Sequence, residues 1–238
     1  LSNSDQNETK ELELLDTMLG KQVDGIVMMS DHVTDKIASA IRQSPVPVVL
    51  AGSIINDSSI PSVNIDYFQA AMDAIQLFIN KGHKEIAFVS GPLEYTINGE
   101  HKLGAYKQAL QQANIEINEQ LIDATDGTYD EALLSWESFV QKAHVPTAIF
   151  AGSDEIALGV IHAIQDAGKR VPEDVEVISF ENSKLARMIR PQLTSVALPL
   201  YDIGAVSMRL LTKLLNKEEV PDKNVILPYR IETRKSTK

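Results

Sequence analysis

Residues 148–168 read AIFAGSDEIALGVIHAIQDAG, a short apolar run followed by a turn and a longer amphipathic segment. Ala148–Ala151 is typical of a buried strand, and Glu155–Gly168 has the apolar spacing of a helix. The turn between them, Gly152-Ser153-Asp154, consists of small and polar residues. Because acidic side chains complement the dipole at a helix start, we interpret the Asp154-Glu155 pair as a helix start rather than as a catalytic pair.

The same alternation of strand and helix continues in both directions from this stretch. Strands or extended segments are predicted at 23–29, 46–50, 62–65, 85–90, 121–124, 148–151, 175–180, 195–198, 225–227 and 230–233. Helices are predicted at 10–20, 31–43, 67–80, 99–113, 129–143, 155–168 and 201–216. Short apolar strands that alternate with longer helices indicate an α/β fold with parallel sheets covered on both faces. The chain has more strand–helix alternations than one small sheet usually contains, and the pattern divides near Ile65–Tyr67. We therefore expect two doubly wound lobes facing across a hinged cleft.

Composition excludes several classes of protein. The chain has 238 residues and no cysteine, so thiolate zinc sites, thiol nucleophiles and disulfides are excluded, and a reducing compartment such as the cytoplasm is expected. The net charge is −11, so the chain does not have the excess of lysine and arginine that is typical of a nucleic-acid binder. No apolar run is long enough to span a membrane. The sequence begins at Leu1 without a leader peptide, and we expect that it starts inside a longer protein.

Motifs of catalysis are missing from the sequence. It contains no phosphate-binding loop, no dinucleotide-binding glycine motif after a strand, and no zinc-protease or serine-hydrolase motif. The histidines fall in five different predicted elements: His32, His83, His101, His144 and His162. We therefore predict no catalytic residue, no metal site and no cofactor, although an enzyme that uses the cleft stays open as an alternative.

The helix predicted at 201–216 has two contrasting sides. At about 100° per residue, one side collects the residues expected to be buried: Ile203, Ser207, Leu210, Leu211 and Leu214. The other side carries Asp202, Val206, Arg209 and Lys213. Arg209 and Lys213 are one turn apart, so both cations converge on one spot that suits a phosphate or a carboxylate. An ordinary solvated helix face is the alternative, and spacing alone favours it.

Residues 201–213 resemble the signature helix of carbon-catabolite regulators in the lactose-repressor/galactose-repressor family. Further stretches share this resemblance: 18–26, 45–50, 146–150, 157–162 and 190–196. The resemblance implies a homodimeric transcription regulator whose core is similar to a type I periplasmic sugar-binding protein. It places an N-terminal lobe at 1–65 plus 199–230, lacking its first strand and helix, and a C-terminal lobe at 66–198 plus 231–238. It also implies a helix-turn-helix headpiece for operator DNA that lies outside this sequence. A sugar-transport receptor or another sugar-responsive repressor core of the same fold is the alternative.

Two binding sites follow from the resemblance. The first would bind the phosphocarrier HPr phosphorylated on a serine, or its relative Crh, through Tyr201, Asp202, Ala205, Val206, Arg209 and Lys213. Ser207 stands where alanine is more usual in the family, but it points toward the core. The second would be a cleft for glucose 6-phosphate or fructose 1,6-bisphosphate, lined by Lys102, Ser153, Asp154 and Glu181. Glu181 replaces the aspartate common in the family, Gly52 stands in place of a sugar-binding aspartate, and Gly127 in place of a stacking aromatic with Tyr129 nearby. These departures argue against recognition of a neutral sugar.

Overall fold

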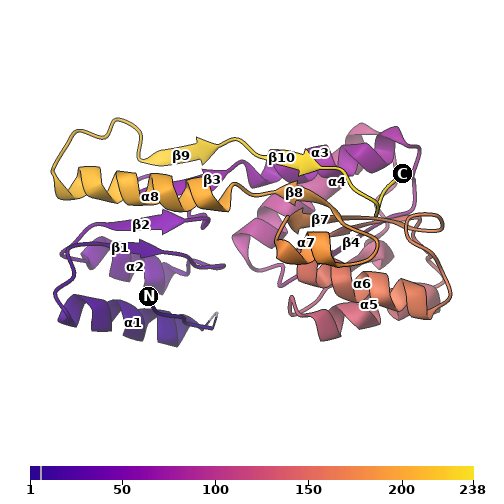
Figure 1. Cartoon of the computed structure of the whole chain (residues 1–238), viewed down its shortest axis with the longest axis horizontal. Helices are drawn as coiled ribbons and strands as arrows, with labels where there is room; N and C mark the ends of the chain where they lie inside the picture. The colour runs from indigo at the N-terminus through magenta and orange to yellow at the C-terminus, as the bar shows by residue number, and fades with distance from the viewer. Residues whose placement is uncertain (6) are drawn as a thin grey trace. The chain divides into compact units, whose positions relative to one another are not determined.

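The chain passes between two folding units after Asp66, after Leu198 and after Pro228. Unit 1 comprises Leu1–Asp66 and Pro199–Pro228, and unit 2 comprises Tyr67–Leu198 and Tyr229–Lys238. The structure is a computed structural model that describes residues 1–5 and 7–238. Each unit has its own sheet, with helices packed on both faces (Figure 1). No helix in the described part of the chain is long and apolar enough to cross a membrane.

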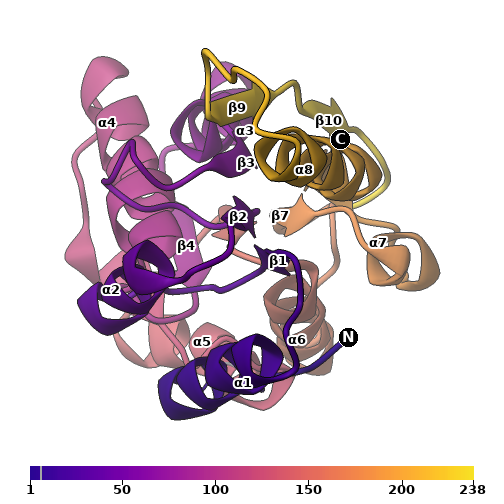
Figure 2. The same ribbon diagram turned by 90° about the vertical axis from the view of Figure 1, so that its left-hand side faces the viewer.

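Unit 1 contains a parallel sheet in the order β1-β2-β3-β9. Its strands are β1 (Ile26–Met28), β2 (Val48–Ala51), β3 (Ser62–Ile65) and β9 (Asn224–Leu227). Helices α1 (Glu8–Gly20) and α2 (Asp35–Gln43) cover one face, and α8 (Leu200–Leu215) covers the other (Figure 2). Side chains alternate along β2, so Val48 and Leu50 pack toward α1 and α2 whereas Val49 and Ala51 pack toward α8. A strand buried on both faces reads as the continuous apolar run that the sequence shows.

Side-chain caps determine where the helices of unit 1 begin. Asn7 Oδ1 accepts a hydrogen bond from Lys10 N at 3.0 Å at the start of α1. Thr34 Oγ1 accepts one from Ile37 N at 3.3 Å, so α2 begins at Asp35 and not at Asp31 as predicted. Each cap satisfies one of the backbone N–H groups that a first helical turn leaves without a partner.

Unit 2 contains a sheet in the order β10-β8-β7-β6-β4-β5. Its strands are β4 (Ile86–Ser90), β5 (Ile122–Ala124), β6 (Ala148–Ala151), β7 (Glu176–Glu181), β8 (Thr194–Ala197) and β10 (Arg230–Glu232). All neighbouring pairs are parallel except β10 and β8, which are antiparallel, so the last strand closes the edge of an otherwise parallel sheet. The helices of this unit are α3 (Tyr67–Asn80), α4 (Gly104–Gln112), α5 (Tyr129–Gln141), α6 (Asp154–Asp166) and the short α7 (Lys184–Met188).

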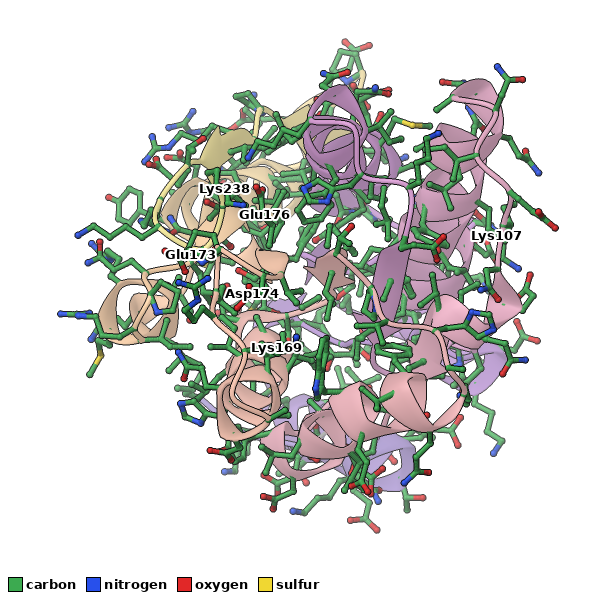
Figure 3. The ribbon with its side chains drawn as sticks, turned by 90° about the vertical axis from the view of Figure 1, so that its right-hand side faces the viewer. Lys107, Lys169, Glu173, Asp174, Glu176 and Lys238 are labelled. Atoms are coloured by element: carbon green, nitrogen blue, oxygen red, sulfur yellow. The ribbon has the colours of Figure 1, made fainter. Side chains whose placement is uncertain are left out.

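The two faces of this sheet have different cores. Residues of α5, α6 and α7 pack on one face around Trp136, Phe139 and Ile161. On the opposite face, the Phe88 ring lies 5.5 Å from the Tyr106 ring of α4, measured between ring centroids. Lys238, the last residue, lies beside Glu176 in this unit (Figure 3). Lys81 Nζ donates to Glu176 Oε2 at 2.8 Å and to the Lys238 carbonyl at 2.6 Å.

A π-helix, η1 (Ile97–Leu103), precedes α4 where the sequence predicted one regular helix over 99–113. A Cβ on Gly99 would lie 1.9 Å from the Leu93 carbonyl oxygen, so only glycine fits at this close approach of two backbone segments. A short 3₁₀ turn, η2 (Glu119–Leu121), occupies the start of the strand predicted at 121–124. Because η1 covers residues 97–103, Lys102 lies on a π-helical turn, a form of helix that is frequent at functional sites.

Candidate functional site

Helix α8 packs onto the sheet of unit 1 through one side only. Ile203, Ser207, Leu210 and Leu211 are buried, as their spacing predicted, and Leu214 is half-buried. The helix lies close to the strand region because Gly25 has no side chain there: a Cβ on Gly25 would be 2.8 Å from a methyl group of Leu211. This packing orients the opposite side of α8 to solvent.

The outward side of α8 carries the residues predicted to bind a partner protein. Tyr201, Asp202, Ala205, Arg209 and Lys213 are exposed, and Val206 is half-buried. The Tyr201 residue is 87% exposed, which is unusual for a large aromatic side chain. Across the described residues 1–5 and 7–238, neither Arg209 nor Lys213 has a carboxylate oxygen within 4.0 Å. Both cations are therefore open to a ligand from solution.

An apolar stripe that the sequence analysis missed runs beside these cations. Leu200 is 52% exposed, Met208 is 54% exposed and Leu215 is 40% exposed. Met208 follows Tyr201 by seven residues, so the two lie two turns apart on one face of the helix. The same helical spacing that pointed to Arg209 and Lys213 could have found Met208.

Lys102 is the first of the residues predicted to line an effector cleft, and it lies inside unit 2. Only 6% of this lysine is exposed. Its Nζ donates to the Gly152 carbonyl at 2.8 Å and to Asn98 Oδ1 at 3.3 Å, and it lies 4.7 Å from the centroid of the Phe180 ring. Buried ammonium groups need such compensation, and here a carbonyl, an amide and an aromatic face supply it.

Ser153 and Asp154 both stabilise the first turn of α6. Ser153 caps the helix, because its Oγ accepts a hydrogen bond from Ile156 N at 3.1 Å. Asp154 is only 1% exposed, and its Oδ1 accepts from Ser179 Oγ at 2.6 Å and from Ser195 Oγ at 3.1 Å. Its Oδ2 accepts from the Ser183 backbone N–H at 2.5 Å. Asp154 and Glu155 therefore lie in a helix start, as interpreted from the sequence, and both carboxylate oxygens of Asp154 are bonded to protein donors.

Glu181 ends β7 in a backbone conformation that favours glycine. Its φ is 107° and that of Asn182 is 57°, both in the left-handed region. Ser195 Oγ accepts from Asn182 N at 3.0 Å, and Arg234 Nη2 donates to Asn182 Oδ1 at 2.6 Å. Strained backbone of this kind persists only where neighbouring contacts hold it, and it is common at ligand sites.

The positions where this chain departs from sugar-responsive relatives have their own structural roles. Gly52 and Gly127 both adopt positive φ, at 69° and 93°. Tyr129 hydroxyl oxygen lies 2.8 Å from His162 Nδ1, and the two rings meet edge to face at a centroid distance of 5.7 Å. The aromatic ring near Gly127 is thus bound to α6. Among the described residues, no three histidine, aspartate or glutamate side chains are grouped so as to hold a metal ion.

Comparison with known proteins identifies the family. Residues 75–237 match the family described as "Periplasmic binding protein-like domain". Catabolite control protein A of Priestia megaterium is 56% identical over 100% of this chain, which spans 72% of that protein. The chain belongs to the catabolite control protein A family.

Solved structures support the same assignment. The crystal structure of the transcription regulator CcpA of Lactococcus lactis is similar at a TM-score of 0.93 and 42% identity, covering 100% of this chain and 87% of that chain. The transcriptional regulator CelR, solved in complex with cellobiose, is similar at a TM-score of 0.88 and 29% identity, covering 97% and 71%. The predicted fold class and the resemblance to the lactose-repressor family are confirmed. The chain is the core of a transcription regulator.

Proposed function

We propose that this core binds HPr phosphorylated on a serine, or the related Crh, through the outward side of α8. The observation that carries the proposal is the pair Arg209 and Lys213, which are exposed, one turn apart and not paired with any carboxylate in the described part of the chain. On a chain of net charge −11, two converging cations that have no carboxylate within 4.0 Å in the described part of the chain are a selective place for an anion.

The chemistry of a phosphoserine matches this pair. It carries about −1.5 to −2 charges near neutral pH and three acceptor oxygens. The planar guanidinium of Arg209 offers a two-pronged donor, and Lys213 adds a point charge. Asp202 would face a donor on the partner, while Tyr201, Ala205 and Val206 would supply apolar contact. The protein would act as a homodimer in the cytoplasm. Binding of the phosphorylated partner would then control how its helix-turn-helix headpieces bind operator DNA.

We also propose that glucose 6-phosphate or fructose 1,6-bisphosphate acts as an effector at the carboxyl ends of the unit 2 strands. The buried Lys102 ammonium lies at this edge, where it donates to the Gly152 carbonyl after β6, and Ser153, Asp154 and Glu181 belong to the same edge. Calorimetric titration of the chain with each sugar phosphate, and with the unphosphorylated sugar, would test this. A heat that depends on the phosphate and disappears in Lys102→Met supports the assignment. Equal binding of neutral sugars would instead indicate a sugar-responsive repressor core.

The partner proposal is tested by measuring binding of serine-phosphorylated and unphosphorylated HPr to four forms of the chain. These are the parent, Arg209→Ala, Lys213→Ala and Lys21→Ala, in which Lys21 is an exposed cation at the end of α1. Loss of a charge-assisted contact should weaken binding of the phosphorylated form by about tenfold or more in the first two variants. Unphosphorylated HPr should respond little, and Lys21→Ala should match the parent. Equal losses for both forms of HPr would refute a phosphate contact.

A further inference from the structure

A pocket opens at the edge of the unit 1 sheet where β2 and β3 begin. It has a volume of about 360 Å³ and lies between the end of α2, the loops that precede β2 and β3, and the last turn of α8. Figure 2 views unit 1 from the side where its strands begin, because the arrows of β1 and β2 in Figure 1 point away from that side. The lining of the pocket includes none of the residues predicted to bind the partner protein or the effector.

The pocket is mostly apolar and its walls are stiff. Its most buried lining residues are Ile41, Val48 and Ile60, which are 7%, 4% and 2% exposed. Leu214 of α8 adds a further apolar side chain. Three prolines, whose rings fix the backbone dihedral φ, belong to the lining as well: Pro45, Pro47 and Pro61. Because such loops have little conformational freedom to lose, a ligand would meet a pocket that is already formed.

Arg42 is the one charged residue in the described lining of this pocket. It lies in the last turn of α2 and is exposed. Its Nη1 donates to Asp57 Oδ2 at 2.7 Å, which uses only one of the several N–H donors of the guanidinium. Among residues 1–5 and 7–238, no second acceptor is hydrogen-bonded to Arg42. The other donors of this side chain are therefore open to a ligand.

The hydroxyl groups of the lining are already used within the loops. Ser44 Oγ donates to the Val46 carbonyl at 2.8 Å, and Ser59 Oγ donates to Asp57 Oδ1 at 2.6 Å. Since Arg42 holds the other oxygen of Asp57, both carboxylate oxygens have donors. A sugar would find few free hydrogen-bonding groups in this pocket. A ligand with an apolar body and one anionic end would match both the apolar walls and the free donors of Arg42.

We propose that this pocket binds a small aryl carboxylate, with its ring against the prolines and its carboxylate on Arg42. The volume of about 360 Å³ equals that of about twelve waters at roughly 30 Å³ each, so a ligand of about ten non-hydrogen atoms fits. The C–H groups of proline rings pack against the negative face of an aromatic ring. The planar guanidinium offers a carboxylate two parallel hydrogen bonds. The proposal is independent of the α8 and effector sites, because it shares no residue with them.

The experiment titrates the full 238-residue chain with 3-phenylpropionate and follows the protein by NMR. Saturable shifts are expected, with a Kd on the order of 1 mM for a ligand of this size. Protons of the ligand ring should show nuclear Overhauser effects to the methyl groups of Ile41, Ile60 and Leu214. Shifts that never saturate, or ring contacts only to methyl groups outside the pocket, would overturn the proposal.

Variants of α2 test the contact with the carboxylate. Arg42→Gln should weaken binding of 3-phenylpropionate about fivefold, and Arg42→Lys, which keeps the charge but loses the fork, should weaken it less. The neutral 3-phenylpropanamide, which has the same size, should bind Arg42→Gln and the parent within about twofold, so a general loss of folding would be recognised. Lys36→Gln is the matched control, because Lys36 is an exposed cation on α2 outside the lining. Equal weakening of the acid by Arg42→Gln and Lys36→Gln would show only general attraction and contradict the proposal.

Further arms separate the pocket from other ways of binding the acid. Acetate should not compete, because it lacks the apolar body; competition at similar concentrations would indicate a simple anion site and overturn the proposal. Hexanoate should bind about threefold more weakly than 3-phenylpropionate, and equal binding would remove the preference for a ring. Arg209→Ala should leave binding unchanged. If that variant abolishes binding, the acid occupies α8 and the inference is wrong.

Discussion

Ser179 donates a hydrogen bond to Asp154 Oδ1 at 2.6 Å inside unit 2, where the serine is 0% exposed and the aspartate 1%. A second hydroxyl, from Ser195, and one backbone N–H complete the set of donors around this carboxylate. The residue that resembles an effector ligand therefore also joins α6 to β7 and β8. Buried carboxylates are tolerated when their oxygens are satisfied in this way.

Asp154→Ala should destabilise the chain by about 3 kcal/mol, because it leaves buried donors on Ser179 and Ser195 without an acceptor. The loss is measured as the change in free energy of unfolding in urea. Asp166→Ala is the matched control at the exposed end of the same helix, and it should change stability by less than about 0.5 kcal/mol. Equal changes in the two variants would show that the buried hydrogen bonds carry no special stability.

Gly159→Ala should cost about 1–3 kcal/mol, because it overpacks the contact between α5 and α6. The added Cβ would lie 2.6 Å from the Tyr129 carbonyl oxygen and 2.8 Å from Ala132 Cβ, so the two helices would have to separate. Gly204→Ala is the natural comparison, since nothing lies within 4 Å of its Cβ position on α8. That change should stabilise the chain by about 0.5–1 kcal/mol, and thermal unfolding of both variants would reveal the opposite signs.

Ser207→Ala should leave stability unchanged or raise it by up to about 1 kcal/mol. Ser207 is 0% exposed on the buried side of α8, and its hydroxyl has no hydrogen-bond partner in the described part of the chain. Alanine removes a buried polar group without a large change in volume and has the higher helix propensity. Chemical denaturation of the parent and the variant tests this, and a clear loss of stability would mean that the hydroxyl is satisfied.

Helices with strong, long periodicity and buried apolar strands such as those at 62–65 and 148–151 were predictable from the sequence, whereas short or irregular helical turns were not. The helix expected at 67–80 has the bounds of α3, Tyr67–Asn80, because its apolar stripe continues over the whole segment. The five residues of α7 are too few to show a helical period, so this helix was missed. The π-helical turn at 97–103 was missed because it depends on the contact between Gly99 and Leu93, which local spacing does not encode.

The same distinction holds for the candidate sites. The exposure of Arg209 and Lys213 follows from spacing along one helix, so the sequence could predict it. The environment of Asp154 depends on Ser179 and Ser195, which are 25 and 41 residues away along the chain. Pairing over such separations is decided by the sheet register, and a single sequence contains no signal for it.

Glu11 on α1 should make stability depend on pH in a direction opposite to that of a salt-bridged carboxylate. Glu11 is 8% exposed, and this burial raises the pKa of its carboxyl above the ordinary 4.5. The hydrogen bonds that Ser30 and Ser4 donate to the carboxylate act in the opposite direction but are the smaller effect. The folded state therefore binds the proton more tightly than the unfolded state. The stability that this proton adds is complete below about pH 4.5 and is lost as pH rises through the raised pKa.

Glu11→Gln removes this titrating group. Its free energy of unfolding should therefore increase relative to that of the parent as the pH rises from about 4 to about 7. Urea unfolding at a series of pH values measures the difference between the two proteins. Glu13→Gln, which changes an exposed glutamate on the same helix, is the matched control for the loss of one carboxylate. If the curves of Glu11→Gln and the parent stay parallel over this range, burial does not favour the protonated form of Glu11, and the carboxylate is as well stabilised in the fold as in water.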